Sequence, residues 1–229
     1  MKRFLFCFII FFISLNTLAQ VDYSGNYGFQ DRVYVDKNSP WKPNKDEVQQ
    51  GKMGDLTLLK IDSGKYKFWL SVNRGWPNYH SGDIDGIMIM QGSKGIYNFK
   101  QDYTDSPCVM IFTFKKNLVE VEQNSSDAEC GFGVGVYADG DYKKKDSKKI
   151  TNASLKDLNT FFTTYKIVSD KAFLYEEGAG TTKKKQYFVK DDIVMATTEN
   201  DDYVYVEYIS ASGKFIYGWI KKSDLKEVK

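Results

Sequence analysis

The stretch Pro107–Tyr142 reads PCVMIFTFKKNLVEVEQNSSDAECGFGVGVYADGDY and decides the fold of the first half of the chain. At every second position from 108 to 114 stand Cys108, Met110, Phe112 and Phe114, which would share one face, and Val and Glu alternate over residues 119–122. This is the period of β-strands that bury one face. We expect a further strand at residues 133–137 and a turn at residues 138–142. The stretch therefore predicts a series of short antiparallel strands.

Residues 1–19 have the pattern of a signal peptide. Lys2 and Arg3 precede an uninterrupted run of ten apolar residues, which is short for a bilayer span and typical of a signal-peptide core. A buried N-terminal strand or an uncleaved anchor is the alternative interpretation. Cys7 lies inside the run and not after it, so a lipidated N-terminus is not expected. We expect cleavage after Ala19 and export to the periplasm or the medium, with no transmembrane segment left.

The charge of the mature chain is balanced. The full sequence has 32 basic and 30 acidic residues, and removal of Lys2 and Arg3 leaves 30 of each. This balance argues against a general electrostatic attraction to nucleic acid or to anionic membrane. The 16 Tyr and 16 Phe favour β-sheet over helix.

Cys108 and Cys130 are the cysteines that remain after cleavage. An even number of cysteines in an exported chain is typical of a disulfide, and closing a loop of about 22 residues stabilises the fold by roughly 3 kcal/mol. A metal pair or a catalytic thiol is the competing interpretation. A metal would need more His or Cys nearby, and the chain has one His. We therefore predict a disulfide.

Residues 20–145 form the first predicted domain. The alternating pattern indicates about six to eight strands at intervals of roughly ten residues, without a convincing helix, which predicts an antiparallel up-and-down barrel or a sandwich. The order Cys-Gly-Phe-Gly, short strand and Ala-Asp-Gly-Asp-Tyr turn at residues 130–142 resembles small exported bacterial domains of the calycin-like type. Lysozyme-inhibitor proteins of the cell envelope include barrels of this kind.

One loop of this domain is a candidate contact site for a partner. Residues 74–83 (RGWPNYHSGD) carry Trp76, Tyr79 and His80 between two predicted strands. Binding residues are often found on loops that a rigid scaffold positions. The alternative is an ordinary loop tip whose Trp is tucked inward.

Residues 146–164 are predicted to link two domains. The basic run at residues 143–149 (KKKDSKK) is interpreted as solvated linker, with contact to an anionic envelope polymer as the alternative. Two helical turns are expected at residues 154–162, with Asn152 or Ser154 as the N-cap. We expect this helix to lie between the domains.

The alternating pattern returns over residues 165–229, with five or more short predicted strands. Four groups of residues follow one another: Ala172, Leu174 and Tyr175; then Tyr187 to Asp192; then Tyr203 to Val206; and finally Gly218, Trp219, Ile220 and Leu225. In this order they resemble the bacterial SH3-like (SH3b) domain, and Gly-Trp-Ile is the most specific part. Asp191 stands where that family commonly has Gly, and Tyr203 where it commonly has Trp. The resemblance implies a small β-barrel used for binding in the cell envelope.

Five aromatic residues of this domain are candidate partner-binding residues. Tyr offers an apolar face and a polar tip, which suits a binding groove. Ordinary packing is the alternative, and it is the favoured one for each of them taken singly. The candidates are Tyr175, Tyr187, Tyr203, Tyr217 and Trp219.

The sequence offers no convincing catalytic, cofactor or metal residues. His80 is the only histidine and the mature cysteines are expected to be paired, so a Cys–His peptidase is excluded in its usual form. No Gly-x-Ser-x-Gly motif and no phosphate-binding glycine motif is present. Asp83 and Asp85 fit a fragment of a calcium loop whose other ligands are missing. Paired carboxylates of a glycosidase stay open as an alternative.

These observations predict an all-β, exported, non-catalytic binding protein of the bacterial cell envelope, without a cofactor. Its partner would be peptidoglycan, a peptide or an envelope protein, and not nucleic acid. The alternative is an inhibitor or immunity-type protein that acts on a muralytic enzyme, with residues 74–83 entering the enzyme's cleft.

Overall fold

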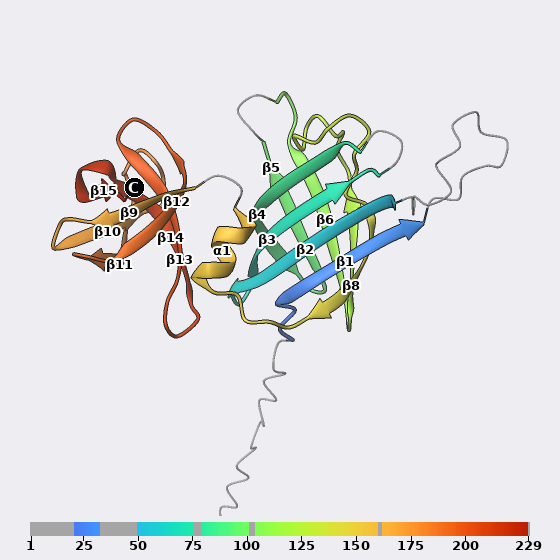
Figure 1. The fold of residues 1–229 in the computed structure, drawn as a ribbon, viewed down its shortest axis with the longest axis horizontal. Coiled ribbons are helices and arrows are strands. Elements are labelled where there is room, and N and C mark those ends of the chain that lie inside the picture. Colours follow the sequence, from blue (N-terminus) through green and yellow to red (C-terminus); the bar gives the residue numbers. More distant parts are fainter. Residues whose placement is uncertain (1–20, 33–49, 76–78, 101–103, 160–161, 229) are drawn as a thin grey trace, which may run out of the picture.

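The computed structural model describes residues 21–32, 50–75, 79–100, 104–159 and 162–228. The predicted signal peptide and Trp76 lie outside the described residues. The chain folds into two β parts with one short helix next to their junction (Figure 1). The predicted all-β architecture with a disulfide-closed barrel is thus confirmed.

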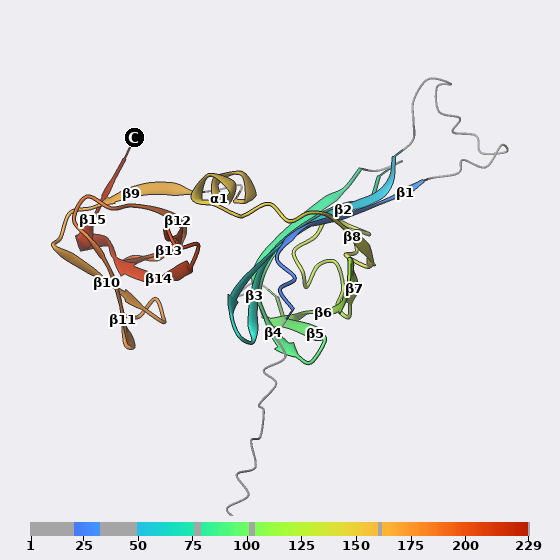
Figure 2. The same cartoon turned by 90° about the horizontal axis from the view of Figure 1, so that it is seen from below.

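The first part is a closed barrel in which every strand pairs antiparallel with its sequence neighbours and β1 pairs with β8 (Figures 1 and 2). Its strands are β1 (Gly25–Arg32), β2 (Gln50–Asp62), β3 (Lys65–Asn73), β4 (Ser81–Gln91), β5 (Lys94–Phe99), β6 (Cys108–Lys115), β7 (Leu118–Gln123) and β8 (Gly140–Asp146). This up-and-down order leaves no strand edge unpaired around the ring.

Side chains along each strand point alternately inward and outward, and the inward ones fill the barrel interior. In β6, Cys108, Met110, Phe112 and Phe114 all point inward, as the sequence pattern predicts. Each of the eight strands contributes at least one buried side chain to the same core. The ring of Phe68 packs 5.0 Å from that of Phe112, centroid to centroid. Burial of such large aromatic side chains is the main term that holds the barrel together.

The segment after Cys130 differs from the prediction. Residues 133–137 do not form a strand, and β8 begins at Gly140, inside the predicted turn. Gly131 and Gly135 have φ of 72° and 71°, a left-handed conformation that turns the chain and interrupts pairing. The Phe132 ring lies against Gly82 of β4, where a Cβ would be 2.2 Å from it. The segment therefore packs into the barrel core, to which Phe132, Val136 and Ala138 contribute.

The basic run at residues 143–149 also differs from the prediction, because β8 takes it up to Asp146. Pairing with β1 and β7 on both sides imposes the strand there. The helix α1 (Asn152–Leu158) starts two residues before the predicted one. Thr151 is its N-cap: the Thr151 hydroxyl oxygen accepts a hydrogen bond from Ser154 N, and Ser154 Oγ accepts one from Thr151 N.

The second part is an antiparallel sheet of seven strands in the order β11-β10-β14-β13-β12-β9-β15. They are β9 (Thr163–Ile167), β10 (Lys171–Tyr175), β11 (Lys183–Val189), β12 (Ile193–Glu199), β13 (Tyr203–Ile209), β14 (Phe215–Lys221) and β15 (Leu225–Glu227). A short 3₁₀ helix, η1 (Lys222–Asp224), precedes the last strand. One face of the curved sheet encloses a core that includes Leu174, Val204, Val206 and Ile220.

The two parts pack directly on one another. A second apolar cluster joins Trp69 on the outside of the barrel to Leu155 of α1 and to Met195, Ile209 and Phe215 of the sheet. The side-chain amide of Asn152 donates to Ile209 O and accepts from Ile209 N, which fixes α1 to β13. The helix therefore lies beside the junction, as the sequence predicts.

Candidate binding surfaces

The second sheet carries a row of aromatic and lysine side chains on the face opposite its core. Alternation brings Phe173 and Tyr175 of β10 to this face, since their neighbours Ala172 and Leu174 are buried in the core. Strand pairing then places side chains of β11, β14 and β13 beside them. We call the set the aromatic–lysine face: Lys171, Phe173, Tyr175, Lys183, Tyr187, Tyr203, Trp219 and Lys221.

Rings on this face contact one another across the strands. Tyr175 and Tyr203 are 5.6 Å apart between centroids, and Phe173 and Tyr187 are 5.5 Å apart. Trp219 meets Tyr205 edge to face at 5.6 Å. Tyr187 is 45% exposed, and the other rings of the face are partly exposed. The structure thus brings together four of the five aromatic candidates of this domain.

The lysines of this face lie over its rings. Lys183 Nζ is 3.3 Å from the centroid of Phe173, Lys171 Nζ is 4.9 Å from that of Tyr187, and Lys221 Nζ is 5.9 Å from that of Tyr175. At an exposed site such a contact is worth only about 0.5–1 kcal/mol. Among the ion pairs of the described residues, none involves these three amines.

Two glycines let the loop between β10 and β11 pass along the edge of this face. A Cβ on Gly180 would lie 1.9 Å from the Tyr203 hydroxyl, and one on Gly178 would lie 3.4 Å from the Trp219 ring. Gly180 has a φ of 66°, which favours glycine in any case. Asn200 Nδ2 donates to Gly178 O at 3.0 Å and holds the loop in place.

The fifth aromatic candidate, Tyr217, projects from the same side of β14 as Trp219, but nearer the barrel. Its ring stacks 5.5 Å from that of Phe215, within the apolar cluster between the two parts. Lys184 Nζ lies 4.3 Å from the Tyr217 ring and donates to its carbonyl oxygen at 2.9 Å. Burial lowers the pKa of Lys184. Tyr217 therefore packs at the junction, where the barrel covers this side of the sheet.

Sequence reasoning overlooked several members of the face. Phe173 is two residues before Tyr175, so the strand alternation was a signal that could have found it. Lys171 follows from the same alternation. The positions of Lys183 and Lys221 beside the rings depend on the pairing of β11 with β10 and of β14 with β13, which only the fold reveals.

The loop between β3 and β4 holds the other candidates. Tyr79 is 52% exposed and has a φ of 47°; its N–H donates to Gly75 O at 2.8 Å. His80 Nδ1 lies 2.9 Å from Val134 O in the segment after Cys130. The loop is thus tied at its base to that segment, and the His80 ring is engaged by a backbone carbonyl.

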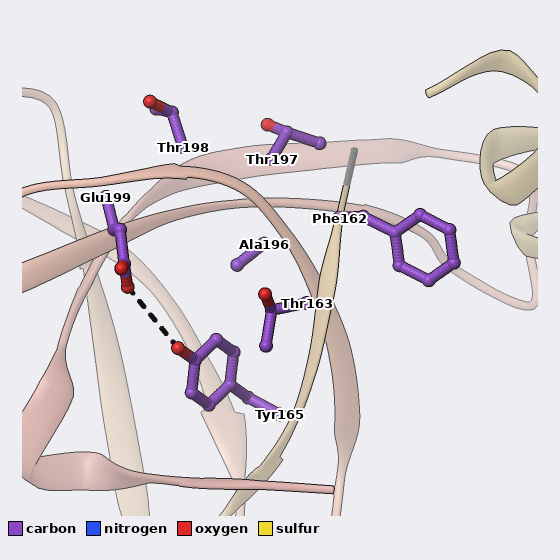
Figure 3. Close-up of a pocket in the computed structure, with 7 residues that line it drawn as sticks. All are labelled: Phe162, Thr163, Tyr165, Ala196, Thr197, Thr198 and Glu199. Carbon is purple, nitrogen blue, oxygen red and sulfur yellow. Dashed lines mark hydrogen bonds between the residues drawn. The ribbon is translucent and has the colours of Figure 1, made fainter. Parts of the chain in front are cut away.

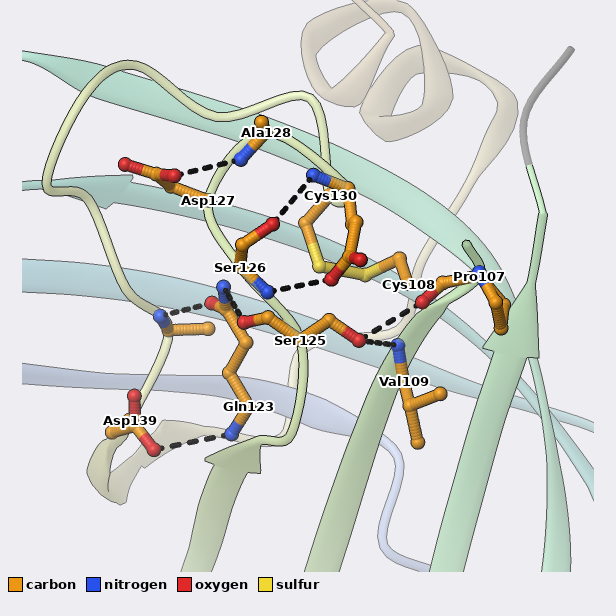
Figure 4. Close-up of a disulfide and its surroundings, with 12 residues drawn as sticks. Pro107, Cys108, Val109, Gln123, Ser125, Ser126, Asp127, Ala128, Cys130 and Asp139 are labelled. Carbon is orange, nitrogen blue, oxygen red and sulfur yellow. Dashed lines mark hydrogen bonds between the residues drawn. A yellow bond between two sulfur atoms is a disulfide. The ribbon is translucent and has the colours of Figure 1, made fainter. Parts of the chain in front are cut away.

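The disulfide between Cys108 and Cys130, predicted from the sequence, is present and anchors this segment to the start of β6 (Figure 4). Next to it, Ser125 Oγ accepts a hydrogen bond from Val109 N and donates one to Pro107 O. Both cysteines are buried in the barrel core. The arrangement is that of a structural crosslink.

A groove with a volume of about 540 Å³ runs between the outer wall of the barrel, α1 and β12. Four of the residues that line it are aspartates: Asp55, Asp83, Asp85 and Asp157. Asp83 and Asp85 belong to strand β4 and not to a loop. Within the described residues, no three His, Cys, Asp or Glu side chains are grouped as a metal ion would require.

Lys67 lies behind this groove, buried between two carboxylates. Its Nζ contacts Asp85 Oδ2 and lies 2.6 Å from Glu207 Oε1. Burial disfavours the ammonium form, but the two carboxylates outweigh it and raise the pKa of Lys67. Glu207 is 1% exposed and is not among the residues that line the groove. This cluster therefore joins the two parts and presents no accessible pair of acids.

A second hollow, of about 390 Å³, lies on β9 and β12 (Figure 3). Three of its lining residues are threonines, and Phe162 stands at one side. The Tyr165 hydroxyl donates to Glu199 Oε2 at 3.4 Å. Burial and this neighbouring carboxylate raise the pKa of Tyr165, so the phenol stays protonated. The hollow offers hydroxyl groups but no nucleophile with an adjacent base.

The described part of the chain contains no helix with the length and apolar character needed to span a bilayer. Comparison with known proteins finds no matching family model, no matching curated protein and no matching solved structure.

Proposed function

We propose that the chain is an exported, non-catalytic binding protein of the bacterial cell envelope. It holds a wall polymer, peptide or protein on the aromatic–lysine face of its second sheet. The observation that carries this proposal is the grouping of five partly exposed rings and three lysines on one sheet face. Aromatic residues are enriched where proteins recognise partners.

The SH3b resemblance supports the same proposal. The Gly-Trp-Ile sequence at Gly218 lies in β14, and its Trp219 belongs to the aromatic–lysine face. Asp191, which stands where that family commonly has Gly, has a φ of 74°. This is the conformation that glycine adopts most readily, so the backbone at this position suits the family pattern.

Export is supported by the buried Cys108–Cys130 disulfide, because such crosslinks persist in oxidising compartments. A non-catalytic role is supported by the state of the cysteine and histidine side chains, which could have formed a nucleophile–base pair. The cysteines are joined to one another, and the His80 ring contacts Val134 O.

Co-sedimentation tests the proposal. The mature protein (residues 20–229) is mixed with purified peptidoglycan sacculi and, separately, passed over a column of envelope extract. We expect retention by one of them, weakened about tenfold by Tyr187→Ala. Tyr137→Ala is the matched control, because Tyr137 is 43% exposed and Tyr187 is 45% exposed. No retention of the wild-type protein by either material would overturn the proposal.

An inhibitory role is the second candidate, favoured by the exposed Tyr79 on a loop tied down at its base. Such a tip could enter the cleft of a muralytic enzyme. The test measures lysozyme and amidase activity with the mature protein at micromolar concentrations. Inhibition that Tyr79→Ala abolishes and Tyr137→Ala preserves supports the role; unchanged activity with the wild-type protein removes it.

A further inference from the structure

We infer that the aromatic–lysine face binds an anionic polysaccharide, whose sugar rings stack on the aromatic side chains while its acidic groups meet the lysine amines. This inference rests on the proposed function and names the class of ligand. It is carried by the lysine amines of the face, by its extended shape and by the way those lysines are held.

The lysine amines of the face contact aromatic rings, whereas some other surface lysines contact carboxylates. Four other surface lysines are paired with carboxylates: Lys115 with Glu120, Lys145 with Asp55, Lys166 with Asp191 and Lys222 with Glu199. Lys171, Lys183 and Lys221 instead contact aromatic rings. In a mature chain with balanced charge, these amines are positive charges that an acidic ligand can neutralise.

Nearby acids do not cancel this charge by direct pairing. The Glu177 carboxylate accepts hydrogen bonds from Thr181 Oγ1 at 2.7 Å and from Thr182 N at 3.1 Å, within its own loop. These bonds lower the pKa of Glu177 and keep its carboxylate occupied with the loop. Asp201 and Asp202 line a hollow together with Lys221, so the amines that an acidic ligand can meet are chiefly those of Lys171 and Lys183.

The shape of the face suits a chain and not a small molecule. Its rings lie across four neighbouring strands, β11, β10, β14 and β13. Adjacent strands are about 4.8 Å apart, and side chains two residues apart on one strand are roughly 7 Å apart. Small-molecule sites are typically concave. A row of rings on an open sheet is better matched by an extended polymer.

The lysines can change partner when a ligand arrives. Each amine now lies over a ring, an interaction worth about 0.5–1 kcal/mol at an exposed site. An exposed ion pair with a carboxylate is worth a similar amount, about 0.2–1 kcal/mol. Moving an amine from Phe173 or Tyr187 to an acidic group therefore costs little, and it uncovers the ring for stacking with a sugar.

Single-stranded nucleic acid also combines acidic groups with stacking surfaces. The predicted export favours the polysaccharide, because acidic glycans are the polyanions of the envelope. Nucleic acid is accordingly one of the outcomes of the test.

The test uses polygalacturonate and fully methyl-esterified polygalacturonate, which share a backbone and differ in charge. Affinity electrophoresis of the mature protein measures retardation in gels that contain either polymer. We expect retardation by polygalacturonate that falls with added salt, and at least tenfold weaker binding of the ester. Equal binding of both polymers, no retardation by polygalacturonate, or tighter binding of single-stranded DNA would each overturn the inference.

Variants locate the site. Lys171→Met with Lys183→Met removes the charge and keeps most of the apolar stem, and it should weaken binding of polygalacturonate at least tenfold. Lys171→Arg with Lys183→Arg keeps the charge and should keep binding. Lys116→Met, in the turn between β6 and β7, is the control for the loss of one exposed charge. Binding that the double Met variant leaves intact would contradict the site.

The sacculus experiment separates this inference from the proposed function. If sacculi or an extract protein retain the protein while polygalacturonate and its ester behave alike, the ligand class is wrong and the binding role stands. If neither sacculi nor extract retains it and polygalacturonate does not retard it, both fail.

Discussion

Lys67 Nζ lies 2.6 Å from Glu207 Oε1, and the two residues belong to different parts of the molecule. Lys67 is on the outer wall of the barrel, and Glu207 is on the sheet face that the barrel covers. Trp69 lies alongside, with its ring centroid 5.3 Å from the same amine and its Nε1 donating to Asn159 Oδ1. The junction is therefore apolar around a buried ion pair, and it couples the two parts into one unit.

The first prediction concerns this ion pair. Lys67→Met leaves the buried Glu207 without its partner, which should lower the free energy of unfolding by about 3–5 kcal/mol. Glu207→Leu should lower it less, because Lys67 keeps its contact with Asp85. The double variant should lose far less, because two apolar side chains then meet at the junction. Urea unfolding of all four proteins gives the coupling energy. If the losses of the two single variants simply add in the double variant, the contact between Lys67 and Glu207 does not itself stabilise the fold.

The second prediction concerns alkaline pH. Burial raises the pKa of Tyr27 and of Tyr66 to about 12, so folding keeps these phenols protonated where the unfolded chain ionises them. Stability should fall as the pH rises from about 10, the unfolded value, toward 12. The raised pKa of Lys67 acts in the same direction: its contribution is complete below about 10.4 and is lost as the pH rises through the folded value.

Urea unfolding at neutral and alkaline pH checks this pH dependence. Tyr27→Phe should be less stable at neutral pH, because the hydrogen bond from its hydroxyl to Tyr23 O is lost. Its stability should then depend less on pH above 10. A stability that rises with pH in this window would contradict the buried protonated phenols.

The third prediction concerns the disulfide. Cys130→Ser should lower the free energy of unfolding by about 2–5 kcal/mol, because the crosslink spans 22 residues and holds the segment after Cys130 on the barrel. Polymer binding on the second sheet should be unchanged under conditions where the variant is folded. Loss of that binding in a folded variant would assign the crosslink more than a structural role.

The fourth prediction concerns the apolar junction. Trp69 is 4% exposed and packs against Phe215 with ring centroids 6.4 Å apart. Trp69→Ala should cost about 3–5 kcal/mol and uncouple the two parts, so that two transitions replace one in calorimetry. Tyr137→Ala, at a 43% exposed site on the barrel, should keep a single transition. A single transition in Trp69→Ala would show that other contacts suffice for coupling.

The fifth prediction separates backbone strain from a steric effect at the aromatic–lysine face. Gly180→Ala and Gly92→Ala both place a side chain at positive φ, 66° and 63°, and each should cost about 1–2 kcal/mol. Only Gly180→Ala also forces the Tyr203 ring to move, because a Cβ on Gly92 meets nothing within 4 Å. Polymer binding should weaken in Gly180→Ala alone. Equal effects of both variants on binding would exclude Tyr203 from the site.

Much of the barrel follows from local sequence. The alternation in Cys108–Phe114 sets which side chains face inward, since successive side chains of a strand point to opposite faces. The pairing of the cysteines follows from their number in a chain with a signal-peptide pattern. Alternation of side chains likewise made the strands of the C-terminal part recognisable. The short helix between the two parts was recognisable from its capping residues.

Tertiary structure decided the rest. In residues 131–136 Gly alternates with Phe or Val, which is the period of a strand, but Gly131 and Gly135 turn the chain. Conversely, the lysine-rich β8 is a strand because β1 and β7 pair with it. Lys67 and Glu207 are 140 positions apart, and no local pattern brings them together. Strand alternation is a property of neighbouring residues, whereas the junction and the aromatic–lysine face depend on which distant strands pair and pack.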